Sequence, residues 1–239
     1  MFNTTDKKAK EFLLYSYFKI LPINSYKPEK HNYLKYDQYL TRQCAYRAYL
    51  DLNRTLTVNK EVSDEGRKEL VYGICSKLID YIEALFYKTS DKDFDTTHDK
   101  ICTALKNYIN DENKCSLLSS DSLKFTYGQS QKWLNMTLKY MWLLGLLDGK
   151  IKTEFLHVPV DSYIIKAVWQ FDDIKLPLIE GKLLKDKSRG KYSAEKVDSW
   201  SKWDDENVYK NFQKTLQDSL PNNTSRIEWE HSAWMENAE

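Results

Sequence analysis

Two residues, Lys132 and Asp161, combine reactive groups with the settings in which such groups do chemistry. A lysine amine attacks electrophilic carbon, and an ionised carboxylate stabilises a cation that develops beside it. Lys132 stands near the start of a long apolar stretch, and Asp161 follows Val158-Pro159-Val160 directly before another. The pair therefore suggests covalent or cation-stabilising catalysis.

Asp161 also has a purely structural interpretation, because an Asp directly before an amphipathic run commonly caps a helix. Pro159 biases Val158 toward extended backbone, so a helix is expected to begin after Asp161. The positive field at a helix start favours an ionised carboxylate, which also suits catalysis. The residues alone leave both interpretations open.

Lys132 is placed by the sequence in the first turn of a helix that begins at Gln129. There its charge faces the positive end of the helix dipole, an unfavourable position for an ordinary surface lysine. The functional interpretation is a poised nucleophile, and the structural alternative is an exposed lysine whose stem lies along the helix. Lys139, one heptad later, is the weaker candidate.

The elements that must position these residues are predicted to be helices. Seven Gly and five Pro in 239 residues are too few for the many turns of an all-β fold. Apolar residues recur at helical spacing in 65–87 and 93–108, and the stretch 129–147 is apolar nearly all round, as in a buried central helix. Further helices are expected over 11–20, 39–56, from 161 onward, 203–220 and 227–235, with loops over 24–36 and 148–160, and the fold class is all-α.

Composition indicates which cofactors, cellular location and binding surface to expect. The four cysteines have no C-x-x-C spacing, so neither a metal site nor a cofactor is expected, and scattered thiols favour a reducing compartment. No signal peptide or membrane-length apolar run is present, so the expected location is cytoplasmic. A net charge of +1 requires that any nucleic-acid surface concentrate its positive charge locally.

The stretch 125–168 contains two motifs, a Gly-containing turn and lysine-bearing helix with Gly128, Lys132 and Asn135, and the run His-Val-Pro-Val-Asp over 157–161. With these motifs it resembles the helix-hairpin-helix (HhH-GPD) superfamily of DNA glycosylases, in which a Gly-rich hairpin precedes a lysine-bearing helix and a later Pro-Val-Asp opens another helix. The pattern of residues 131–139 and the 29-residue interval between Lys132 and Asp161 are most similar to the archaeal 8-oxoguanine glycosylases. In one respect the chain departs from the family, because Phe-Thr-Tyr-Gly-Gln-Ser stands at 125–130 in place of Leu-Pro-Gly-Val-Gly.

The resemblance implies a bilobal helical fold with a central cleft, with lobes of about 37–125 and of 1–36 plus 126–239. It implies an enzyme that flips a damaged or modified base out of double-stranded DNA and excises it, acting as a monomer. Asp161 would stabilise the cationic sugar, and Lys132 would attack it to give a Schiff base. If Lys132 does not attack, water does and an abasic site remains. The setting is either base-excision repair or bacterial defence against phage with modified DNA.

The resemblance also implies two sets of binding residues. The base-pocket candidates are Trp133, Trp229, Glu230 and Trp234. The DNA-binding candidates are Gly128, Gln129, Ser130, Lys139, Lys185, Lys187 and Arg189.

One alternative of a different class remains, a noncatalytic helical protein that binds or regulates another protein. Its near-neutral charge and Tyr-rich helices suit that role. Lys132 and Asp161 would then lie apart, whereas side chains that face one cleft favour the enzyme. Asp95 and His98 are interpreted similarly, as a helix-start Asp and a structurally satisfied His rather than an acid/base pair.

Overall fold

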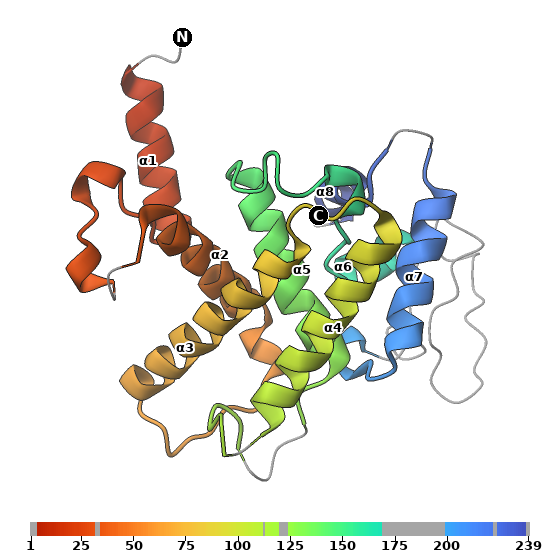
Figure 1. The fold of residues 1–239 in the computed structure, drawn as a ribbon, viewed down its shortest axis with the longest axis horizontal. Helices are drawn as coiled ribbons and strands as arrows, with labels where there is room; N and C mark the ends of the chain where they lie inside the picture. Colours follow the sequence, from red (N-terminus) through yellow and green to blue (C-terminus); the bar gives the residue numbers. More distant parts are fainter. Residues whose placement is uncertain are drawn as a thin grey trace.

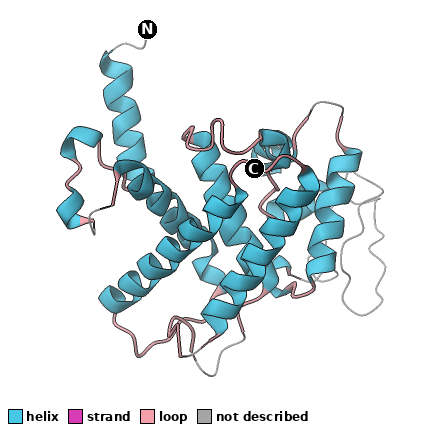
Figure 2. Cartoon of the chain, viewed as in Figure 1, coloured by secondary structure: helices cyan, strands magenta, loops and turns pink. Residues whose placement is uncertain are grey.

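The computed structural model describes residues 4–31, 34–111, 113–119, 124–168, 199–221 and 224–237. Over these residues the chain is helical and contains no strand, apart from one antiparallel bridge between Val58 and Leu118 (Figure 2). The all-α class is therefore confirmed for the described chain. The α-helices are α1 (Thr4–Phe18), α2 (Tyr36–Leu52), α3 (Asp64–Ile82), α4 (Asp91–Asn110), α5 (Tyr127–Leu143), α6 (Ser162–Ala167), α7 (Glu206–Ser219) and α8 (Arg226–Asn237).

Short 3-10 turns occupy several of the connections. Two of them, η1 (Ile23–Ser25) and η2 (Pro28–Lys30), lie in the segment predicted as a loop. The others are η3 (Asn53–Thr55), η4 (Glu83–Leu85), η5 (Thr153–Phe155) and η8 (Trp200–Lys202).

Helix α5 is the central element. Figure 1 shows it crossing the middle of the molecule, and it packs against α2, α4 and η8. Its first half is buried on every side, as its nearly continuous apolar sequence predicts. The buried hydrophobic side chains from Cys44 to Ile227 form one cluster, and the division into two lobes stays a prediction.

The start of α5 differs from the prediction by two residues. Thr126 caps the helix through Oγ1, which accepts a hydrogen bond from the Gln129 amide, while the Gln129 side chain accepts one from the Thr126 amide. The helix therefore begins at Tyr127, and Lys132 lies in its second turn rather than its first.

The four cysteines are buried free thiols. Burial raises the pKa of each, which keeps them protonated and unreactive. Within the described ranges no helix is both long and apolar enough to cross a membrane.

Candidate functional site

Lys132 and Asp161 lie side by side. The Lys132 amine is 2.7 Å from Asp161 Oδ2 and 3.4 Å from the Pro159 carbonyl oxygen. Both residues are buried, at 4% and 8% exposure, so the ion pair is shielded from bulk water. Two residues 29 positions apart in sequence are thus brought into direct contact.

Asp161 performs the structural role as well. Its Oδ1 accepts hydrogen bonds from the amides of Tyr163 and Ile164, which makes Asp161 the N-cap of α6. The backbone of Asp161 is extended, with φ −142°, as is usual for an N-cap residue. One carboxylate oxygen therefore fixes the side chain and leaves the other for Lys132.

The pair faces a cavity of about 740 Å³. Four elements, α1, α2, α5 and α8, supply most of its wall, together with the start of α6 and Trp200. The volume is within the range of sites that bind organic molecules. Besides Lys132 and Asp161, the lining residues are Tyr17, Phe18, Asp51, Arg54, Met136, Lys139, Tyr140, Leu143, Tyr163, Trp200, Glu230, His231, Trp234 and Met235.

A second ion pair, between Lys139 and Glu230, lines the same cavity. Its side chains are 12% and 1% exposed. Lys139 lies two helical turns beyond Lys132 on α5, so both lysines project from one face of the helix and each meets a carboxylate. Lys139, a predicted DNA-binding residue, pairs with a carboxylate inside the cavity.

A phenol–carboxylate group forms another part of the cavity wall. Tyr140 donates a hydrogen bond to Asp51, and the Tyr17 hydroxyl lies 3.0 Å from the Tyr140 hydroxyl. Burial, together with the Asp51 charge, raises the pKa of Tyr140, so the phenol remains a donor. Arg47 pairs with Asp51 at 2.7 Å and lies over the Tyr17 ring.

Aromatic and apolar side chains surround the cavity mouth. Tyr17, Leu143, Trp234 and Met235 line the cavity while remaining 46%, 49%, 40% and 55% exposed. The Trp234 ring lies against Tyr163, with centroids 5.2 Å apart. Exposed apolar groups gathered at a cavity are typical of a binding site.

The base-pocket predictions divide into two groups. Glu230 and Trp234 line the cavity, whereas Trp133 and Trp229 do not. Trp133 is fully buried and its indole N–H donates to the Ala45 carbonyl, so it is a core residue. Trp229 is half-buried and packs against the core cluster. An apolar helix face and a cavity face are indistinguishable in the sequence, which explains these two corrections.

The backbone amides of three DNA-binding candidates already have partners within the protein. The Gly128 amide donates to the Trp203 carbonyl, the Gln129 amide to Thr126 Oγ1, and the Ser130 amide to the Thr126 carbonyl. All three residues are buried, which corrects their assignment as DNA-binding residues. The remaining DNA-binding candidates, Lys185, Lys187 and Arg189, lie outside the described residues.

Gly128 has a different role, which only a glycine fills. A Cβ at this position would lie 1.9 Å from the carbonyl oxygen of Trp200. The close approach brings η8 onto the start of α5, and Trp200 of η8 lines the cavity. Gly128 thus shapes the site through backbone contact.

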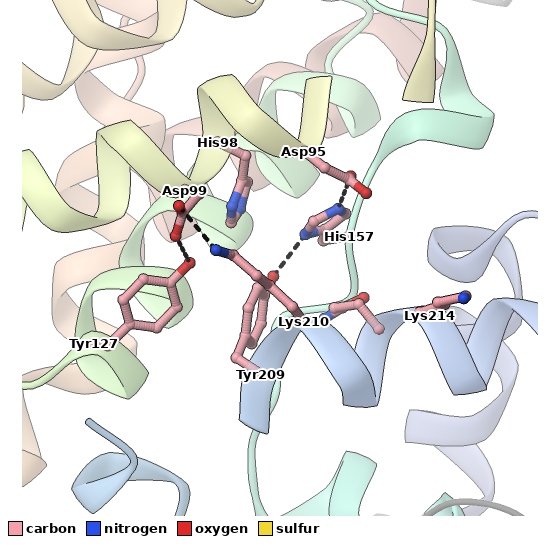
Figure 3. Close-up of a pocket in the computed structure, with 9 residues that line it drawn as sticks. Asp95, His98, Asp99, Tyr127, His157, Tyr209, Lys210 and Lys214 are labelled. Atoms are coloured by element: carbon pink, nitrogen blue, oxygen red, sulfur yellow. Dashed lines mark hydrogen bonds and ion pairs between the residues drawn. The ribbon is translucent and has the colours of Figure 1, made fainter. Parts of the chain in front are cut away.

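A smaller pocket, of about 30 Å³, is lined by polar side chains of α4 and α7 together with Tyr127 and His157 (Figure 3). His157 Nε2 is 2.8 Å from Asp95 Oδ1, and His157 Nδ1 is 2.8 Å from the Tyr209 hydroxyl. Asp95 thus pairs with His157 rather than with His98, which instead contacts Asn135 Oδ1 at 2.7 Å. Burial and the neighbouring His157 lower the pKa of His98 to about 3.

Several cavity residues were missed by the sequence analysis. Met136, Tyr140 and Leu143 follow Lys132 at helical spacing, so the face of α5 that carries Lys132 could have revealed them. Tyr17, Asp51 and Arg54 belong to the distant helices α1 and α2 and to η3, and no local pattern indicates that they meet α5.

Among the described residues no group of three or more His, Cys, Asp or Glu side chains is arranged to hold a metal ion. No family model, curated protein or solved structure matches the chain.

Proposed function

We propose that the protein is a DNA glycosylase that removes a damaged or modified base through Lys132 and Asp161. One observation carries the proposal: the amine and the carboxylate contact each other and both face a cavity large enough for a nucleotide base. This arrangement also favours the enzyme over the noncatalytic alternative.

The chemistry follows from the ion pair. The Lys132 ammonium gives one proton to the departing base, and its Nζ lone pair bonds to the deoxyribose C1′. The glycosidic C1′–N bond breaks and its electrons leave with the base. Asp161 Oδ2, 2.7 Å from Nζ, offsets the positive charge that develops at C1′ and O4′. Transfer of another Nζ proton to O4′ opens the ring and leaves a Schiff base.

The rest of the cavity suits a flipped base. The Trp234 ring offers a stacking face at the mouth, and the Lys139–Glu230 pair presents one donor group and one acceptor group deeper in the wall. A base with both an acceptor and a donor on its edge would satisfy the two groups together. This pair is therefore the proposed reader of base identity.

The test uses synthetic duplexes that each carry one modified base, incubated with the full chain. Base release is measured by alkaline cleavage of abasic sites, and the covalent step by borohydride trapping of a protein–DNA adduct. We expect at least one duplex to give both signals, Asp161→Asn to give neither, and Lys132→Gln to give no adduct. Lys152→Gln, an exposed lysine outside the cavity, is the matched control and should behave as wild type.

The experiment has three informative outcomes, and each leads to a different conclusion. Release without trapping assigns the attack to water and leaves Asp161 as the catalytic group. Full activity in Asp161→Asn refutes the assignment of that residue. No release and no binding to any duplex at low salt refutes the glycosylase proposal.

One observation favours the noncatalytic alternative as a second candidate. Helix α1 carries four large hydrophobic side chains that are at least 46% exposed, Phe12, Leu13, Tyr15 and Tyr17. Exposed apolar side chains gathered on one helix are typical of protein-binding surfaces. A partner captured equally by wild type and by Lys132→Gln, with no DNA activity in either, would support it.

A further inference from the structure

The segment that carries Asp161 is held almost entirely by side chains. Val158, Pro159 and Val160 belong to no helix or strand, yet all three are buried. Each non-proline residue brings one backbone donor and one acceptor that need partners in the interior. Those partners come from α5 and α7 on either side.

Two glutamines make the same two-point contact with this segment. Gln131 of α5 accepts from the Val160 amide at 3.2 Å and donates to the Val160 carbonyl at 3.2 Å. Gln213 of α7 accepts from the Val158 amide at 3.2 Å and donates to the Val158 carbonyl at 2.8 Å. Both amides are fully enclosed, at 0% and 2% exposure. Each glutamine side chain thus makes the pair of hydrogen bonds that the backbone of a neighbouring β-strand would otherwise make with this segment.

Asn135 links the two-point contacts of Gln131 and Gln213, which we call the clamps. Its Nδ2 lies 3.1 Å from Gln131 Oε1, 3.2 Å from the Val158 carbonyl and 2.7 Å from the Tyr209 hydroxyl. Its Oδ1 then accepts the N–H of His98. Every polar atom of this side chain is committed, so its orientation is fixed.

The network reaches the surface through Tyr209, His157 and Asp95 (Figure 3). Because the Asp95 carboxylate accepts from His157 Nε2, His157 Nδ1 carries no proton and accepts from the Tyr209 hydroxyl. Tyr209 in turn accepts from Asn135. The half-exposed carboxylate of Asp95 therefore sets the direction of every hydrogen bond back to the clamps.

We infer that Gln131 and Gln213 are positioning residues that fix the Val158–Val160 backbone and so hold Asp161 Oδ2 against the Lys132 amine. The Pro159 carbonyl, 3.4 Å from that amine, is held by the same clamps. Gln213 does not line the large cavity, so its effect reaches the reaction only through the backbone. The catalytic part of this inference rests on the proposed glycosylase function, whereas the geometric part does not.

The test changes Gln213 to Leu, with Gln217→Leu as the matched control. Gln217 lies one turn later on α7, and its Oε1 accepts no hydrogen bond. For base release we expect Gln213→Leu to lower kcat about 10- to 100-fold with KM within about twofold, because the cavity is unchanged but the carboxylate is displaced. Gln217→Leu should leave both constants at wild-type values.

A second readout needs no enzymatic activity. A lysine amine that is hydrogen-bonded to a carboxylate reacts slowly with acetic anhydride, and mass spectrometry gives the labelling of each lysine. Lys139, paired with Glu230 in the same cavity, serves as the internal reference. We expect the Lys132-to-Lys139 labelling ratio to rise several-fold in Gln213→Leu and to stay unchanged in Gln217→Leu.

A third variant covers the case in which Gln213→Leu does not fold. In Gln213→Glu the protonated carboxyl can both donate and accept, whereas the ionised form cannot donate to the Val158 carbonyl. Its labelling ratio should approach the wild-type value as the pH falls. An unchanged ratio in the folded Gln213 variants overturns the inference, even if wild type proves inactive on every duplex, which would refute only the proposed function.

Discussion

The two carboxylate oxygens of Asp161 have different partners, and Oδ2 lies 2.7 Å from the amine of Lys132 while Oδ1 caps α6. The cap and the ion pair are therefore one arrangement rather than competing interpretations. The cap prevents rotation of the carboxylate, and the Lys132 amine meets an oxygen whose position is already set. This is the preorganisation that electrostatic catalysis requires.

The first prediction concerns the energy of this pair. Lys132→Met and Asp161→Asn each leave one group without its partner, so each should lower the free energy of unfolding by about 3 kcal/mol. The Asn still caps α6, so the cost comes from the pair itself. The double variant should lose clearly less than the two single losses combined, as measured by urea unfolding. Additive losses would mean that the two groups do not interact in solution.

Much of the fold can be predicted from the sequence, because helices are encoded by local patterns of apolar and capping residues. The periodic apolar residues of α3 and α4, the apolar run of α5 and the Asp161 cap all predicted elements that the structure contains. Lys132 and Asp161 were singled out by residue type and local setting, and the structure brings them together. Boundaries moved by a few residues, because capping groups such as Thr126 lie outside the apolar pattern.

The rest of the site depends on packing between distant segments. Trp133 and Trp234 have the same chemistry, yet one is enclosed in the core and the other lies at the cavity mouth. Gln131 appears in the sequence as an ordinary helix residue, and only the fold brings it to Val160. The Gly128 amide has a partner that the sequence does not reveal, because Trp203, directly after η8, folds back onto it.

The second prediction concerns base selection. Glu230→Gln removes the charge that partners Lys139 while keeping the size of the side chain. If the pair reads the base edge, kcat/KM for the preferred base should fall about 10- to 100-fold, since hydrogen bonds to charged groups contribute about 1.5–3 kcal/mol. Competition between duplexes with different bases measures the change. An equal loss on every base would show that Glu230 does not select among them.

The third prediction uses two glycines. Gly128→Ala should lower the free energy of unfolding by about 1–3 kcal/mol or more, because the new Cβ meets the Trp200 backbone rather than a movable side chain. Base release should weaken as well, since Trp200 lines the cavity. Gly73→Ala, where nothing lies within 4 Å, is the control and should stabilise α3 by up to about 1 kcal/mol. Equal unfolding midpoints for the two variants would contradict the close approach at Gly128.

The last prediction concerns acid sensitivity. Burial lowers the pKa of His98 to about 3 and holds that of His157 well below its ordinary value. These two side chains take up protons near pH 6.5 in the unfolded chain but not in the folded chain, so their contribution to stability is complete only above that pH. Below it, each histidine should reduce the free energy of unfolding by up to about 1.4 kcal/mol per pH unit. Acidic groups with a raised pKa, such as Asp95, act in the opposite direction, so wild type alone does not isolate the effect.

The variant His98→Gln isolates the contribution of His98 to the pH dependence of the unfolding free energy. Its amide N–H still serves Asn135 Oδ1, but the side chain takes up no proton between pH 7.5 and 4.5. Urea unfolding of both proteins across that range should therefore give a difference in unfolding free energy that is constant above about pH 7. Below about pH 6 the difference should shift in favour of the variant, by about 1 kcal/mol or more at pH 5. Parallel curves would mean that His98 takes up its proton in the folded chain as readily as in the unfolded chain.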